Sequence, residues 1–175
     1  MKWMSSPLLF LGASLFAYAE DWPKWRGVRG DGTWNGPSIA QDLDKEDLAR
    51  GWKVPIHPGY SGVTVQGNRV LVMDRPPVEG GREMERALCF DRKNGKKSWE
   101  FVYPAEYKKL DYDKGPRASL TLTKDRVFGL GAMGHAFCLD INTGKMVWLR
   151  DLVRDEDCPL PVSYTHLTLP TILLV

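Results

Sequence analysis

The sequence predicts an all-β fold built from four-stranded antiparallel units, and an internal repeat carries this prediction. The stretch from Ala136 to Trp148 reads AFCLDINTGKMVW, and 49 residues earlier Ala87 to Trp99 reads ALCFDRKNGKKSW. Six of the thirteen aligned positions are identical. Each copy is an alternating run, a turn rich in Asp, Asn and Gly, and a second run ending in Trp, which is typical of a β-hairpin. Hairpins repeated at this period indicate a β-propeller, in which each repeat forms one blade.

The residues shared by the two hairpins have structural explanations. A glycine stands where the turn needs a positive φ, and an aspartate can cap the same turn through its carboxylate. The tryptophan of each hairpin is expected to lie against the neighbouring blade, where an indole buries a large area. The structural repeat residues singled out on this basis are Trp52, Trp99, Trp148, Asp91, Asp140, Gly95 and Gly144.

Two full blades and one lone leading strand account for most of the chain. The predicted strands are 62–66, 69–74, 86–91 and 97–102 in one blade, and 118–123, 126–131, 135–140 and 145–150 in the other. Before them, Gly51 to Ile56 carries Trp52 where the last strand of a blade carries its Trp, which predicts a strand that completes the final blade and closes the ring. A propeller closes with about 4–8 blades, so the chain is expected to be a fragment.

Four segments are predicted along the chain: a signal peptide at 1–19, an irregular Trp-rich lead-in at 20–50, a partial propeller at 51–160 and a non-native tail at 161–175. The lead-in is expected to be an ordered loop in which Trp22 and Trp25 fill a surface groove, with a helical turn near 42–48. In the tail, the run from Val162 to Thr171 resembles a translated sequencing adapter.

The first nineteen residues indicate export. Lys2 precedes an apolar run, Pro7 to Phe16, that is too short to span a bilayer as a mature helix. Ala-Tyr-Ala then predicts cleavage between Ala19 and Glu20. We therefore expect a soluble periplasmic or extracellular protein without a membrane span in its mature chain.

Charge and cysteine content exclude two classes. The formal charge is +2 with scattered basic residues, which argues against a nucleic-acid-binding protein. The chain has three cysteines, and this small, odd number does not fit a disulfide scaffold. Cys89 and Cys138 occupy equivalent strand positions in separate blades and are expected to be free, buried thiols.

Several patterns that can mark a chemical site have better structural explanations. Gly129 to Gly134 spells GxGxxG, but an alternating run follows it instead of the helix that a dinucleotide site requires. Asp111, Asp113 and Gly115 miss the spacing of an EF-hand. The three histidines, His57, His135 and His166, form no ligand pattern. No catalytic, cofactor-binding or metal residue is therefore assigned.

The turn pattern D-x-x-[NT]-G-K-x-x-W at both hairpins resembles the PQQ-type (pyrroloquinoline quinone) propeller repeat. The segments DWPKWRG, Gly115-Pro116-Arg117 and LGAMGHAFCLD are similar to exported PQQ-like propeller proteins of the BamB-like and quinoprotein dehydrogenase-like group. The resemblance covers roughly residues 21–157.

Two functions follow from the resemblance. The first is a non-catalytic exported scaffold or binding module that holds a protein or polymer partner on its propeller loops and needs no cofactor in this part of the chain. The alternative is the N-terminal part of a PQQ-dependent quinoprotein oxidoreductase, a dehydrogenase that uses PQQ and calcium. The chain shows neither adjacent cysteines nor an acidic calcium cluster, and we therefore favour the first function.

Overall fold

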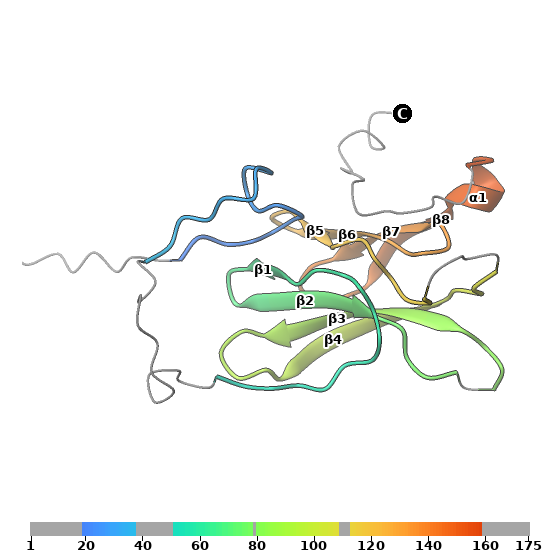
Figure 1. The fold of residues 1–175 in the computed structure, drawn as a ribbon, viewed down its shortest axis with the longest axis horizontal. Coiled ribbons are helices and arrows are strands. Elements are labelled where there is room, and N and C mark those ends of the chain that lie inside the picture. Colours follow the sequence, from blue (N-terminus) through green and yellow to red (C-terminus); the bar gives the residue numbers. More distant parts are fainter. Residues whose placement is uncertain (1–18, 38–50, 79, 109–112, 159–175) are drawn as a thin grey trace, which may run out of the picture.

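The computed structural model describes residues 19–37, 51–78, 80–108 and 113–158, and within them it forms two four-stranded antiparallel sheets (Figure 1). Each sheet has its strands in sequence order, β1-β2-β3-β4 and β5-β6-β7-β8. This confirms the predicted all-β fold and its blade-like antiparallel units. The strands are β1 Thr64–Gln66, β2 Arg69–Asp74, β3 Met84–Asp91, β4 Lys97–Pro104, β5 Thr121–Leu122, β6 Arg126–Leu130, β7 His135–Asp140 and β8 Met146–Asp151; a short helix, α1 Leu152–Asp155, follows.

The strand bounds agree with the predicted ones within a few residues. Strands β2 and β7 have the predicted bounds, and β3 and β4 are two residues longer than expected at their outer ends. Strand β5 keeps only two of the six predicted residues. The amide of Leu122 in β5 donates to the carbonyl of Pro23, 2.7 Å away, so the lead-in takes up part of the edge of this strand. We call β1–β4 the first blade and β5–β8 the second blade.

The prediction of a leading strand at Gly51 to Ile56 is wrong, because the structure forms no strand there. A strand needs a neighbour to complete its ladder of hydrogen bonds, and no described strand pairs with this segment. The side chain of Trp52, in this segment, still contacts the first blade, because its indole Nε1 donates to the carbonyl of Arg92 at 2.7 Å. Trp52 therefore makes the contact expected of its position in the repeat, although it does not lie in a strand.

The described part of the lead-in, residues 20–37, forms backbone hydrogen bonds with the first strands of the two blades. The backbone of Trp22 exchanges two hydrogen bonds of 2.9 Å with Val65 in β1, and the carboxylate of Asp21 accepts from the amide of Gly67. One segment thus covers edge groups of both blades, which would otherwise be open to pairing with another chain. Trp25 does not fill a groove as predicted, because 48% of its surface is exposed.

The main core lies between the two blades. It joins side chains from β2, β3 and β4 to side chains from β6 and β7, and Phe137, Leu139 and Ile141 are almost completely buried in it. Cys89 and Cys138 are buried and unpaired, as predicted. The two sheets therefore pack face against face, which is how neighbouring blades of a propeller share their apolar surface.

Some predictions fall on residues outside the described part. These are the signal peptide up to residue 18, the helical turn at 42–48 and the tail at 161–175. Among the described residues, no helix has the length and apolar character needed to cross a membrane.

Candidate functional site

The two hairpin turns, which we call the first turn (91–95) and the second turn (140–144), are built in the same way. Oδ1 of Asp91 accepts from the amides of Lys93 and Asn94 at 2.8 and 3.2 Å. In the second turn, Oδ1 of Asp140 accepts from the amides of residues 142 and 143 at 3.1 and 2.9 Å. Each turn ends in a glycine at positive φ, 70° for Gly95 and 68° for Gly144. The aspartate caps the turn and the glycine supplies its reversal.

Each turn is covered by the tryptophan of the preceding repeat. A Cβ built on Gly144 would lie 2.6 Å from the Trp99 ring, and one built on Gly95 would lie 2.6 Å from the Trp52 ring. The Trp99 Nε1 donates to the carbonyl of Ile141 at 3.0 Å, in the position that Arg92 takes for Trp52. Trp99 is only 8% exposed. An indole on a glycine turn therefore joins the first blade to the second.

A buried carboxylate lies where β3 and β4 meet the second blade. Glu85 is fully buried, and its oxygens accept hydrogen bonds from the hydroxyls of Tyr103 and Tyr107. Its Oε1 also accepts from the amide of Ala132 in the β6–β7 turn at 3.1 Å. A buried carboxylate is costly unless donors surround it, and here three donors from three segments do so. Glu85 therefore ties the first blade, the linker after β4 and the second blade together.

The two tyrosines of this cluster keep their protons. Burial, together with the charge of Glu85, raises the pKa of Tyr103 and of Tyr107 well above the usual value of a phenol. Both hydroxyls are therefore donors at physiological pH. This assigns the cluster a structural hydrogen-bonding role that stays the same across the neutral range.

A second acidic residue, Glu83, anchors the loops beside this cluster. Its carboxylate contacts Arg75 at 2.8 Å and Lys114 at 2.7 Å, and it accepts from the amide of Tyr107 at 2.9 Å. The hydrogen bond from Lys114, with those from Tyr107 and Arg75, lowers the pKa of Glu83 to about 2 although partial burial acts the other way. This carboxylate is therefore ionised in the folded protein at any ordinary pH, and it holds the loop after β2 against the linker after β4.

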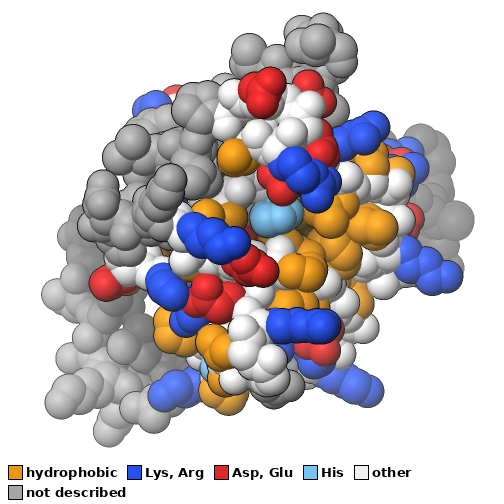
Figure 2. All heavy atoms as spheres, turned by 90° about the vertical axis from the view of Figure 1, so that its right-hand side faces the viewer, with side chains coloured by type: hydrophobic (Ala, Val, Ile, Leu, Met, Phe, Trp, Pro, Cys, Tyr) orange, Lys and Arg blue, Asp and Glu red, His pale blue; other side chains and the backbone are white. Residues whose placement is uncertain are grey.

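A groove runs over these loops at the end of the blades where β4 and β8 finish. We call it the loop-end groove. Figure 2 shows this face, on which acidic and basic side chains surround an apolar area. One part has a volume of about 430 Å³ and is lined by Pro104, Glu106, Lys108, Met133, His135, Asp151, Val153 and Arg154.

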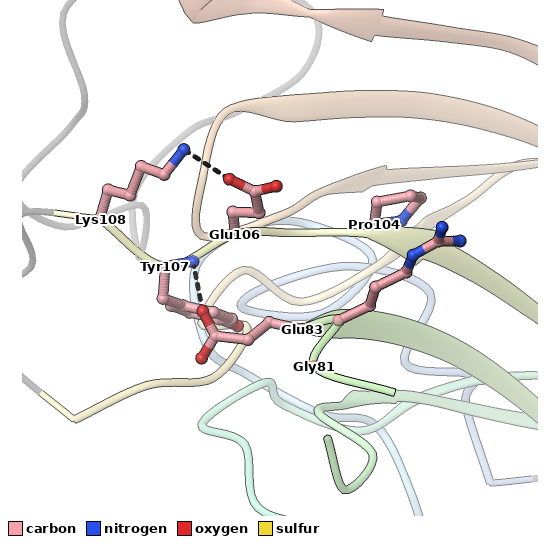
Figure 3. Close-up of a pocket in the computed structure, with 7 residues that line it drawn as sticks. Gly81, Glu83, Pro104, Glu106, Tyr107 and Lys108 are labelled. Atoms are coloured by element: carbon pink, nitrogen blue, oxygen red, sulfur yellow. Dashed lines mark hydrogen bonds and ion pairs between the residues drawn. The ribbon is translucent and has the colours of Figure 1, made fainter. Parts of the chain in front are cut away.

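An adjoining hollow of about 400 Å³ shares Pro104, Glu106 and Lys108 with the first part and continues over Glu83 and Tyr107 (Figure 3). In Figure 3 the ammonium of Lys108 points toward the carboxylate of Glu106, and an ion pair joins these two lining residues. The loop-end groove therefore combines apolar walls with opposite charges that are already paired to each other.

His135 lies in the wall of the loop-end groove. Its ring packs on Tyr103 with 5.5 Å between centroids, and Nε2 lies 3.9 Å from Oδ2 of Asp151. Nδ1 is buried and has no hydrogen-bond partner among the described residues. Asp151 and His135 sit on paired positions of β8 and β7. The sheet therefore fixes the orientation of this imidazole.

The acidic residues of the blades make structural contacts. Asp74 is fully buried, receives two hydrogen bonds from Arg86 at 2.9 and 2.7 Å and accepts from the amide of His57 at 2.9 Å. Among the described residues, no group of three or more His, Cys, Asp or Glu side chains is placed to hold a metal ion. The GxGxxG run begins in the last two residues of β6, and residues 131–134 form the turn that leads into β7, so a strand follows the run, as predicted, in place of a helix.

The structure brings some predicted residues together and leaves others apart. Trp52 meets the first turn and Trp99 meets the second turn, whereas Trp148 is half-buried beside Phe128, 6.3 Å between centroids. Ala19 and Glu20, at the predicted cleavage site, begin the described part, and Glu20 pairs with Arg29 at 2.7 Å. None of these residues lines the loop-end groove.

The loop-end groove and the Glu85 cluster were missed at the level of sequence. One signal could have revealed Glu85, because it shares a strand face with Cys89, which was predicted to be buried. Tyr107 carries no comparable signal, since it lies in an irregular linker.

Comparisons with known proteins give a likeness among solved structures only. No protein-family model matches the chain, and no curated protein matches it. The crystal structure of BamB from Moraxella catarrhalis is similar with 23% sequence identity and a TM-score of 0.35, over 54% of this chain and 25% of that chain. The aligned part thus spans about a quarter of that protein.

Proposed function

We propose that this chain is part of an exported, non-catalytic β-propeller scaffold or binding module with PQQ-like repeats. It holds a protein or polymer partner on the loops at one end of its blades. The observation that supports this function best is the loop-end groove, because it lies at one end of the blades, where the ends of β4, β7 and β8 meet the linker after β4, the β6–β7 turn and α1. Loops on a rigid sheet scaffold are where proteins place binding residues.

The lining of the groove suits an extended polymer with both apolar and charged groups. Pro104, Met133 and Val153 supply apolar wall, while Lys108 and Arg154 each stand beside an acidic partner. Exposed ion pairs of this kind contribute little to stability. Their side chains can therefore exchange partners with an arriving polypeptide at small cost.

The floor of the groove is fixed before any partner arrives. Glu83 and Glu85 hold the two loops and the linker that form it, through three polar contacts each. A surface that is already ordered avoids part of the entropic cost of binding. The fixed shape of the groove therefore supports a role in binding.

Site-specific photo-crosslinking tests this function. A photoreactive amino acid is placed at Lys108 in the groove and, as a matched control, at Lys124, which is exposed on the β5–β6 turn. We expect protein or polymer adducts in the exporting host at the first position only. Adducts of the same identity and yield at both positions would contradict a specific groove.

A turnover assay tests the non-catalytic part of the proposal. The full-length protein, supplied with quinone and calcium, is expected to oxidise no alcohol or sugar. Dye-linked turnover well above a cofactor-free control would favour a quinoprotein oxidoreductase instead, since quinone chemistry is supplied by the cofactor once a site binds it.

The export part of the proposal has its own measurement. We expect intact-mass analysis of the secreted protein to find Glu20 as the first residue. A secreted protein that retains Met1 would show that the first nineteen residues are not a cleaved signal.

A further inference from the structure

The sequence contains two Asn-Gly pairs, Asn35-Gly36 in the lead-in and Asn94-Gly95 in the first turn. Such a pair can react with itself, because a glycine has no Cβ to keep its backbone nitrogen away from the side-chain amide of the residue before it. The nitrogen attacks the carbon of that side-chain amide when both groups are free to meet. The surroundings of each pair therefore decide whether it reacts.

The pair in the first turn is held by hydrogen bonds at both groups that would react. The amide of Gly95 donates to the carbonyl of Asp91 at 2.8 Å. The Oδ1 of Asn94 accepts from the amide of Lys96, also at 2.8 Å. Both bonds must break before the nitrogen reaches the side-chain carbon. The fold therefore protects Asn94.

The pair in the lead-in is held by its backbone but not at the groups that would react. The amide of Asn35 donates to Oε2 of Glu20 at 2.8 Å, and its carbonyl accepts from the amide of Glu20 at 2.9 Å. Asn35 and Gly36 are both exposed. In the part of the chain that the structure describes, neither the Asn35 side chain nor the Gly36 amide has a hydrogen-bond partner. The fold therefore leaves this pair open to reaction.

We propose that Asn35-Gly36 is a site of spontaneous deamidation in the folded protein. The nitrogen of Gly36 forms a bond to the side-chain carbonyl carbon of Asn35, and the side-chain nitrogen leaves as ammonia with the proton of the attacking nitrogen. Water then opens the resulting ring at either of its carbonyls, which leaves aspartate or isoaspartate at position 35. The reaction needs only water, and the proposal does not depend on the binding function of the loop-end groove.

The reaction would place a new carboxylate beside Glu20. The carboxylate of Glu20 is bound by Arg29 at 2.7 Å, and the same guanidinium lies 3.6 Å from Asp31. A further negative charge at position 35 repels the carboxylate of Glu20, which already accepts from the amide of that residue. Deamidation is therefore expected to weaken the contacts by which Glu20 holds the lead-in.

Peptide mapping of the full chain tests the site. The protein is kept at pH 8 in heavy-oxygen water, which labels the product, and is then cleaved after glutamate. This separates residues 21–46 from residues 86–100, and each peptide contains a single asparagine. Deamidation is expected to be at least about tenfold faster at Asn35 than at Asn94, the factor that opening two hydrogen bonds imposes. Equal rates in the native protein would overturn the proposal.

The same measurement in urea separates the fold from the sequence. Both pairs are then unfolded, and their rates are expected to agree within about threefold, since the same two residue types react in each. A tenfold difference that persisted in urea would show that the hydrogen bonds of the first turn are not its cause, and would overturn the structural argument.

Asn35→Gln is the matched control for the reacting side chain. It keeps the backbone contacts of residue 35, but its ring would have one more atom and closes much more slowly. Gly36→Ala is less suitable, because a Cβ on Gly36 would lie 2.1 Å from the Trp34 ring. The labelled product in residues 21–46 is expected to disappear in Asn35→Gln. Its persistence would place the reaction at another residue and overturn the assignment.

Tryptic cleavage after Arg29 tests the effect of the new charge. Asn35→Asp is compared with Asn35→Gln, which has no charge at the same position. Cleavage is expected to be about twofold faster or more in Asn35→Asp, on the scale of an exposed charge interaction. Equal cleavage rates would show that a carboxylate at position 35 leaves the contacts of Glu20 intact, and would overturn this consequence of the reaction.

Discussion

The indole of Trp99 lies so close to Gly144 that a Cβ on this glycine would come within 2.6 Å of the ring. The two residues come from different blades, and the Nε1 of the same indole donates to the carbonyl of Ile141 at 3.0 Å. One contact thus joins the largest side chain of one repeat to the smallest residue of the next. It explains why tryptophan and glycine recur together in the repeated hairpins.

Gly144→Ala is expected to destabilise the protein by more than a positive φ alone explains. An L-residue in the left-handed region costs about 1–2 kcal/mol, and the new methyl group would also displace the Trp99 ring. Gly67→Ala is the matched control, because Gly67 has a φ of 55° and open space around its Cβ position. Urea unfolding of both variants gives the comparison. Equal losses would mean that the indole does not restrict residue 144.

Tyr107→Phe is expected to reduce the free energy of unfolding by about 1–2 kcal/mol, because it leaves the buried Glu85 carboxylate with one donor fewer. Tyr60→Phe serves as the control, since Tyr60 is half-exposed and its hydroxyl donates to Asp113 at the surface. This control is expected to cost less than about 0.5 kcal/mol. Equal effects in denaturant unfolding would contradict the role of Glu85 in joining the blades.

Cys89 and Cys138 are expected to react with thiol reagents only when the protein opens. Burial raises the pKa of the Cys89 thiol to about 11 and raises that of Cys138 above its usual value. Cys158 is exposed and serves as the internal control. At pH 8 one thiol is expected to react quickly in the native protein and all three in denaturant. A disulfide between the two buried cysteines in peptide mapping would contradict their placement.

Glu83 is expected to make stability depend on pH in the acid range. Its pKa is lowered from 4.5 to about 2 in the folded protein, so the ionised form favours folding. This contribution is fully present above pH 4.5 and is lost as the pH falls from 4.5 towards 2. Glu83→Gln is therefore expected to destabilise the protein at pH 6 and to have much less effect at pH 2.

The matched control for Glu83 is Glu156→Gln, because Glu156 is exposed. It is expected to leave the unfolding free energy unchanged at both pH values. If Glu83→Gln lowered stability by the same amount at pH 6 and pH 2, the loss would come from packing, and the ion pairs with Arg75 and Lys114 would not be its cause.

The fold class could be predicted because three features of the sequence indicate the same fold: the period of the repeat, the residue types in its turns, and the alternation of apolar and polar residues in its strands. Aspartate and glycine at fixed places in each repeat define the turns between β3 and β4 and between β7 and β8. The alternating runs of apolar and polar residues gave the bounds of β2 and β7 correctly. The leading strand was predicted wrongly from the same logic. Trp52 has the spacing of the repeat, and its indole does contact the first blade. The spacing therefore predicted the side-chain contact correctly but did not predict whether the backbone around Trp52 pairs as a strand.

The candidate site was much less predictable than the fold. The groove depends on loops whose residues have no period, and Glu83, Tyr107 and Lys114 meet only when the linker after β4 folds back over the first blade. Glu85 could have been found from alternation in β3, but not its three donors, since they come from separate segments. Irregular segments have no register from which such contacts follow.

A double-mutant cycle between Trp99 and Gly144 tests the central claim, that consecutive repeats are joined by an indole on a glycine turn. The free energy of unfolding is measured for the wild type, Trp99→Leu, Gly144→Ala and the double variant. Since a leucine side chain leaves room for the new methyl group, Gly144→Ala is expected to cost less when Trp99→Leu is already present, with a coupling of at least about 1 kcal/mol. Costs that add to within about 0.3 kcal/mol would contradict the account, because independent residues behave in that way.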